Sequence, residues 1–66
     1  MNVQINGTDH DVADAVTVAA LIEQFAGSTR GTAVVLDGEV VPRSQWPDVA
    51  VQAGQRIELI TAVQGG

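Results

Sequence analysis

A single amphipathic segment constrains the fold of this chain more than any other feature. Its apolar residues recur at the spacing i, i+3, i+4 and i+7, and they are Val18, Leu21, Ile22 and Phe25. This spacing places them on one face of a helix. Thr17 precedes the segment and suits the N-cap, and Gly27 is placed to end the helix in the left-handed conformation. One short helix cannot bury its own apolar face, so the remaining residues must supply a sheet that covers it.

Strand-like segments lie on both sides of the predicted helix, and two dipeptides divide them into hairpins. Asn6-Gly7 and Asp37-Gly38 tolerate positive φ at both central positions of a tight turn, which is typical of a two-residue hairpin. Alternating or continuous apolar residues predict strands at 2–6, 8–13, 33–36, 39–41 and 56–61. Residues 42–48 read as an irregular segment that contains Pro42 and Trp46, with Val49 and Val51 buried beneath it.

The order of these elements predicts an α+β domain in which a mixed sheet packs on one helix. The last strand has to find a place in that sheet. If it pairs beside the first strand in parallel, the connection becomes a right-handed crossover.

Composition narrows the function. The chain has 66 residues, no cysteine and a net charge of −5. It therefore has one core without disulfides, and it would be repelled by nucleic acid and by an anionic membrane surface. The acidic balance suits docking to basic protein surfaces. We find no signal peptide and no segment of membrane-spanning length, so we expect a cytoplasmic protein.

Short motifs spread along the chain resemble one known family. These are Thr17-Val18, Val41-Pro42-Arg43-Ser44-Gln45-Trp46, Gly54-Gln55-Arg56-Ile57 and the terminal Gly65-Gly66. Together with the element order they resemble the ThiS family, the sulfur carriers of bacterial thiamine thiazole synthesis. The resemblance implies a β-grasp (ubiquitin-like) domain over residues 1–61 and a flexible tail over residues 62–66 that ends in Gly-Gly.

Two glycines at a chain end suit acyl activation. The terminal carboxylate is ionised near neutral pH and can attack a phosphate of ATP. Without Cβ atoms, Gly65 and Gly66 can thread a narrow channel of an activating enzyme. The resemblance implies that Gly66 is adenylated and converted to a thiocarboxylate, with Gly65 and Gln64 recognised as part of the tail.

The same resemblance implies the partners of the chain. They are a ThiF-like adenylating enzyme that uses ATP, a sulfur donor protein and a ThiG-like thiazole synthase. The sequence offers no credible nucleophile or acid–base pair. We therefore expect a carrier rather than an enzyme, without a bound cofactor or metal.

Several side chains could have either a docking role or a structural role. Alternation puts Ile60 on the sheet face without the helix, so Ile60 and Val63, with Val34 or Val35, are predicted docking contacts. His10 is predicted to lie in a solvated turn. Trp46 is predicted to cap the core, and the role of Arg43 stays open between docking and covering Trp46.

Three alternative functions stay open from sequence. The chain resembles MoaD-like carriers of other sulfur pathways in fold and in its terminal Gly-Gly. A ubiquitin-like protein modifier would use Gly66 in a different reaction. A plain β-grasp interaction module would make the tail irrelevant.

Overall fold

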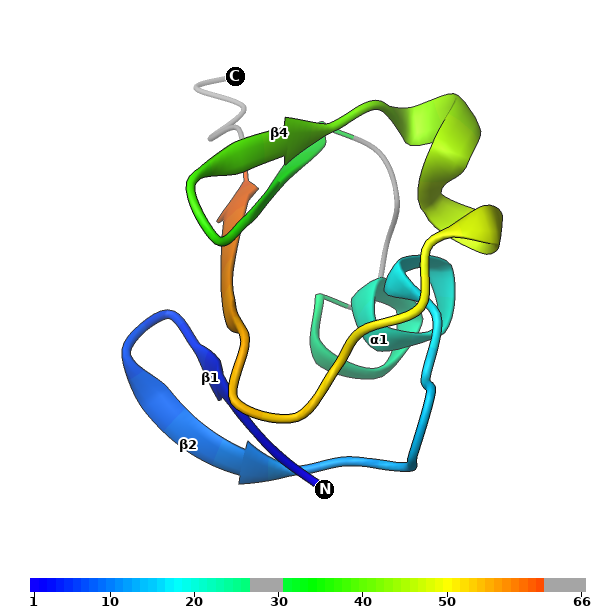
Figure 1. The fold of residues 1–66 in the computed structure, drawn as a ribbon. Helices are drawn as coiled ribbons and strands as arrows, with labels where there is room; N and C mark the ends of the chain where they lie inside the picture. Colours follow the sequence, from blue (N-terminus) through cyan, green and yellow to red (C-terminus); the bar gives the residue numbers. More distant parts are fainter. Residues whose placement is uncertain (27–30, 62–66) are drawn as a thin grey trace.

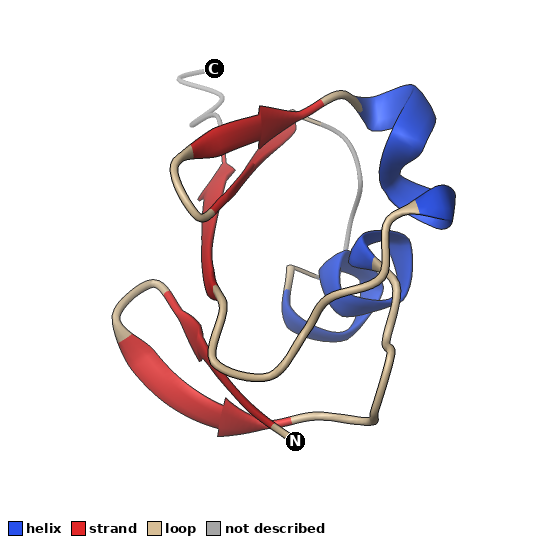
Figure 2. Cartoon of the chain, in the orientation of Figure 1, coloured by secondary structure: helices blue, strands red, loops and turns tan. Residues whose placement is uncertain are grey.

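Five strands form one mixed sheet in the order β2-β1-β5-β3-β4, and both helices lie on the same side of it (Figures 1 and 2). The computed structural model describes residues 1–26 and 31–61. Its elements are β1 Asn2–Ile5, β2 Thr8–Asp11, α1 Val18–Phe25, β3 Thr32–Leu36, β4 Glu39–Val41, the 3-10 helix η1 Arg43–Asp48, and β5 Arg56–Thr61. This arrangement confirms the predicted α+β class.

Both predicted hairpins are present, and their turns have the expected backbone. Asn6 and Gly7 have φ values of 51° and 82°, and Asp37 and Gly38 have φ values of 48° and 85°. Positive φ at both central residues matches the right-handed twist of the flanking strands. The turns join β1 to β2 and β3 to β4 as antiparallel pairs.

β5 completes the sheet by lying between the two hairpins. It pairs in parallel with β1, where Gln4 lies opposite Arg56, and residues 57–61 of β5 pair antiparallel with the whole of β3. The strand that runs into the tail is therefore the central one of the five, and the parallel pairing with β1 is the one that the sequence analysis considered.

Helix α1 covers one face of the sheet with its apolar stripe. The Thr17 hydroxyl accepts a hydrogen bond from the Ala20 backbone N–H at 3.2 Å, which caps the first turn as predicted. Of the predicted stripe, Val18, Leu21 and Ile22 are fully buried and Phe25 is partly buried. The helix ends at Phe25, with Ala26 as its C-cap. The predicted terminator Gly27 lies outside the described residues.

The core is formed by apolar residues of the sheet, α1 and the connections. Its buried members are Val3, Ile5, Val12, Val18, Leu21, Ile22, Val34, Val41, Trp46, Val51 and Ile57. Val51 is buried as expected, and Val49 is partly buried. The Val51 backbone N–H donates to the Val16 carbonyl at 2.7 Å, which ties this connection to the start of α1.

The segment predicted to be irregular is instead the 3-10 helix η1. It begins after Pro42, whose φ of −59° already suits a helical turn, and the Gln45 N–H donates to the Pro42 carbonyl at 2.8 Å. Pro47 lies inside η1. An apolar repeat is absent from this segment, and a short 3-10 turn does not need one.

Trp46 has the structural role that we expected. Its side chain is 3% exposed, and its indole N–H donates to the Val41 carbonyl at 2.9 Å. The guanidinium carbon of Arg43 lies 5.9 Å from the centroid of the ring. Arg43 therefore covers Trp46, at a distance typical of a cation–π contact.

Two predictions about the second strand were wrong. β2 ends at Asp11 rather than at residue 13, although the Val12 N–H still donates to the Met1 carbonyl. His10 does not lie in a solvated turn. It lies in β2 opposite the buried Val3, so its ring faces α1 and contacts Phe25 edge-on, with the centroids 4.8 Å apart.

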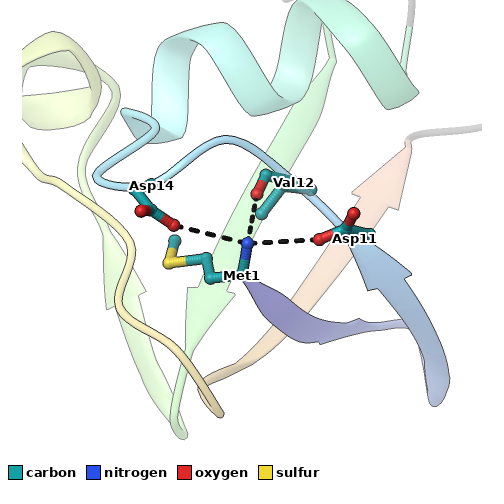
Figure 3. Close-up of polar contacts among 4 residues, drawn as sticks. All are labelled: Met1, Asp11, Val12 and Asp14. Carbon is teal, nitrogen blue, oxygen red and sulfur yellow. Dashed lines mark hydrogen bonds and ion pairs between the residues drawn. The ribbon is translucent and has the colours of Figure 1, made fainter.

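The α-amine of Met1 is held by three acceptors (Figure 3). It donates to the Val12 carbonyl at 2.7 Å and to the Asp11 carboxylate at 3.1 Å, and the Asp14 carboxylate lies 3.4 Å away. The hydrogen bond that the amine donates to the Asp11 carboxylate is the main cause that raises the pKa of this amine, and the Asp14 carboxylate adds to it. The three partners match the three N–H donors of an ammonium group.

We expect the free energy of unfolding to fall as the pH rises through the pKa of the Met1 amine. A pKa that is higher in the folded state than in the unfolded state gives stability that is present below about pH 8 and lost above it. The chain has no lysine, tyrosine or cysteine, so no other group obscures this alkaline range. Urea unfolding at a series of pH values measures the loss.

The matched control is the double variant Asp11→Asn, Asp14→Asn. It keeps the shape of both side chains and removes the charges that raise the pKa. We expect its alkaline loss of stability to be smaller than that of the wild type. Equal pH dependence in the two proteins would contradict an ionic role for this cluster.

Candidate functional site

The candidate site is the end of β5 and the surface beside it. β5 ends at Thr61, and residues 62–66 follow directly in the sequence. The predicted tail residues Val63, Gln64, Gly65 and Gly66 lie outside the described residues. The structure therefore locates the base of the tail, and the roles of these four residues stay predictions.

Side chains from both hairpin turns bind the backbone of β5. The Asp37 carboxylate accepts from the Arg56 N–H at 2.9 Å and from the Gln55 side-chain amide at 3.0 Å. The Asn6 side-chain oxygen accepts from the Leu59 N–H at 2.9 Å. Asp37 therefore binds the start of β5, and Asn6 binds the strand nearer its end.

The two turns differ in the chemistry that β5 presents to them. Asp37 faces two donor groups, so its side chain needs only acceptor atoms. These hydrogen bonds lower the pKa of its carboxyl group, and the bond from the Arg56 N–H contributes most. Asn6 also donates from its side-chain nitrogen to the Leu59 carbonyl at 3.4 Å. Meeting one donor and one acceptor requires an amide.

The sheet face without α1 carries apolar side chains near the end of β5. Directly paired residues share a face, and the register pairs Ala33 with Ile60 and Val35 with Val40. Ile60 is 53% exposed and Val40 is 70% exposed. We call these four residues the apolar patch.

The apolar patch confirms one sequence prediction and corrects another. Ile60 is exposed on the open face as alternation predicted. Val34 is fully buried opposite Leu59 and cannot be a docking contact, whereas Val35 faces the open side. Val40 was not among the predicted docking contacts. Its signal was present, because Val40 and Val41 are consecutive in a strand and only one of them can face the core.

Polar residues cover the rest of the open face, over β1 and β2. The register pairs Asn2 with Asp11 and Gln4 with Asp9 on this side. Glu58 lies opposite Val35, between the polar part and the apolar patch. Glu58 is therefore the acidic neighbour of the apolar patch, and Arg56, which lies opposite Gln4, adds a basic group to the same face.

The described residues offer little for other kinds of site. Within residues 1–26 and 31–61, no three His, Asp or Glu side chains gather as a metal site would require. Neither helix in this part of the chain is long and apolar enough to cross a membrane.

A five-stranded mixed sheet with β1 and β5 parallel at its centre, packed on one helix, defines a β-grasp domain. The model of the ThiS family matches residues 3–66. The chain therefore belongs to the ThiS family. Its members are small sulfur carriers of thiamine biosynthesis rather than catalysts, and the resemblance seen in the sequence is confirmed.

Relatives agree with this assignment. The sulfur carrier protein ThiS of Escherichia coli is 33% identical over 66 residues, which is the full length of both chains. A thiazole synthase of Paramagnetospirillum magneticum is also 33% identical over the whole of this chain, although the chain spans only 20% of that protein.

Solved structures show the same fold. The crystal structure of the thiamine biosynthesis protein ThiS from Geobacter metallireducens superposes with a TM-score of 0.84, at 28% identity and full coverage of both chains. The solution structure of a thiamine biosynthesis protein from the same organism superposes with a TM-score of 0.82 at 28% identity, and the match covers all of this chain and 88% of the solved one.

Proposed function

We propose that the carboxylate of Gly66 is the group on which this carrier holds sulfur. The observation that carries the proposal is the extent of the family match, which runs through residue 66 and includes Gly65-Gly66. The E. coli sulfur carrier is likewise similar over its full length. The position of β5 agrees, because the central strand of the sheet leads directly to these residues.

Activation proceeds in two steps that conserve atoms and charge. In an adenylating enzyme related to ThiF, a Gly66 carboxylate oxygen attacks the α-phosphorus of ATP and pyrophosphate leaves. The product is an acyl-adenylate. A sulfur nucleophile at the oxidation level of sulfide, supplied by a donor protein, then attacks the carbonyl carbon. The bond to AMP breaks, and a thiocarboxylate remains on Gly66.

The tail supplies reach for this chemistry. Residues 62–66 span at most about 17 Å when fully extended. This length lets an enzyme enclose Gly66 while the folded domain stays outside, and Gln64 and Gly65 are the neighbouring positions that the enzyme would recognise. The proposed compartment for this ATP-dependent reaction is the cytoplasm.

The proposed acceptor is a thiazole synthase related to ThiG. The thiazole synthase of P. magneticum contains a segment that is similar to this entire chain. Two domains that are joined in one protein often act in succession on the same substrate. The joined segment therefore supports the proposal that this carrier, as a separate chain, passes its sulfur to a thiazole synthase.

Reconstitution tests the function directly. The chain is incubated with ATP, the adenylating enzyme of its own organism and a sulfide source, and its intact mass is measured. We expect a gain equal to the replacement of one oxygen by sulfur, which depends on ATP. If the adenylating enzyme is active on another carrier and this chain gains no mass, the proposal is wrong. Transfer to molybdopterin precursors would instead indicate a MoaD-like pathway.

We further propose that the apolar patch, with Val63, docks the carrier onto its activating enzyme. We expect Ile60→Asp to raise the KM for the carrier at least about tenfold, because a charge replaces an apolar contact at the centre of an interface. Folding should be preserved, since Ile60 is 53% exposed. Steady-state kinetics of pyrophosphate release measures the effect.

The matched control adds the same charge to the same face, farther from the tail. Asn2→Asp lies on the polar part of the open face and keeps the size of the side chain. We expect its KM to stay close to that of the wild type. Equal effects of the two substitutions would show that charge alone matters and would contradict docking through the apolar patch.

A further inference from the structure

β5 loses its strand partner on one side before it reaches the tail. β1 pairs with β5 only at Gln4–Arg56 and Ile5–Ile57, and the last backbone bond runs from the Asn6 N–H to the Ile57 carbonyl at 2.9 Å. At Asn6 the chain turns away with a φ of 51°. The edge of β5 that faces β1 would therefore be open from Leu59 onward.

The Asn6 side chain occupies the place that the next residue of β1 would have taken. Its oxygen accepts from the Leu59 N–H at 2.9 Å, and its nitrogen donates to the Leu59 carbonyl at 3.4 Å. A side-chain amide presents the same donor and acceptor as a peptide group. Asn6 thus extends the parallel ladder by one more step without a strand.

We propose that Asn6 is a positioning residue for the tail. It holds Leu59, three residues before Ala62, in the sheet, so that the base of the tail keeps a fixed direction when the carrier meets its activating enzyme. A partner that binds a base already held in place loses less conformational entropy on association. This inference rests on the proposed activation of Gly66, and it adds a specific residue outside the tail.

The other hairpin provides a matched comparison. Asp37 occupies the equivalent position of an Asx-Gly turn, with a φ of 48°, and it also binds the backbone of β5. Its bond is to Arg56, at the end of the strand away from the tail. Asn6→Gly and Asp37→Gly therefore remove one clamp each, and glycine tolerates the backbone of both turns.

The test measures two quantities for the wild type and for both variants. The first is amide hydrogen exchange at Leu59, followed by NMR. The second is kcat and KM for activation of the carrier by the adenylating enzyme. For Asn6→Gly we expect faster exchange at Leu59 and a KM raised about five- to tenfold, with kcat little changed. For Asp37→Gly we expect a KM close to that of the wild type at a similar loss of stability.

Each other result overturns the inference. If both variants raise KM in proportion to their loss of stability, Asn6 is merely structural. If Asn6→Gly leaves KM unchanged while the wild type is activated, the clamp does not position the tail and the proposed function stands. If the wild type itself is not activated, the proposed function fails. In that case, unchanged exchange at Leu59 in Asn6→Gly separately refutes the clamp.

Discussion

Deletion of Gly66 is expected to lower the rate of ATP-dependent activation by at least about 100-fold. The new terminal carboxylate, on Gly65, would end one residue short, which is about 3.3–3.6 Å. A displacement of as little as about 1 Å from the productive position of a reacting group can lower the reaction rate about 100-fold. The adenylating enzyme should therefore bind the shortened carrier and fail to activate it. Isotope exchange between pyrophosphate and ATP measures the first step.

Two controls separate chemistry from folding in this experiment. The urea midpoint of the shortened chain should equal that of the wild type, because residues 62–66 lie beyond the predicted domain. Gly66→Ala keeps the length of the tail and adds only a Cβ atom, so any loss in this variant reports the width of the channel. A shortened carrier that is activated at the rate of the wild type would show that Gly66 is not the reacting residue.

Leu21→Ala is expected to have the largest effect on stability, about 2–5 kcal/mol. Leu21 is fully buried on the face of α1 that packs against the sheet. A chain of this length buries a smaller fraction of its surface than a larger domain does, so its total stability lies toward the low end of about 5–15 kcal/mol. The substitution should therefore remove a large share of the stability of the fold.

Urea unfolding followed by the fluorescence of Trp46 measures this effect. Trp46 is the single tryptophan of the chain and is buried in the folded state. Val40→Ala is the matched control, because Val40 is 70% exposed and its truncation should change stability by no more than about 0.5 kcal/mol. Similar midpoints for the two variants would contradict the core that the structure shows.

Much of the fold could be predicted because its signals are local. The stripe of α1 and the two Asx-Gly turns depend on spacing and backbone preference, and both appear where the sequence placed them. The 3-10 helix η1 was missed because it rests on the φ of Pro42 and on burial of Trp46, and neither produces a periodic pattern.

The site was only partly predictable for a related reason. Ile60 could be placed on the open face by alternation within one strand. The error over Val34 came from a continuous apolar run, in which alternation gives no indication of which residues face the core. The bond between Asn6 and Leu59 joins residues 53 positions apart, so only the register of β1 with β5 reveals it.

The most direct test of the carrier chemistry is to locate the sulfur atom within the sulfurated chain. Because the chain has no lysine, trypsin cleaves after arginine only, and cleavage after Arg56 releases the peptide 57–66 that contains the whole tail. Fragmentation of this peptide by mass spectrometry should place the added sulfur on Gly66 alone, in fragments that retain the terminal carboxyl group. Sulfur on any other residue, or a tail peptide without sulfur from a chain that has gained mass, would contradict the proposal that Gly66 carries the sulfur.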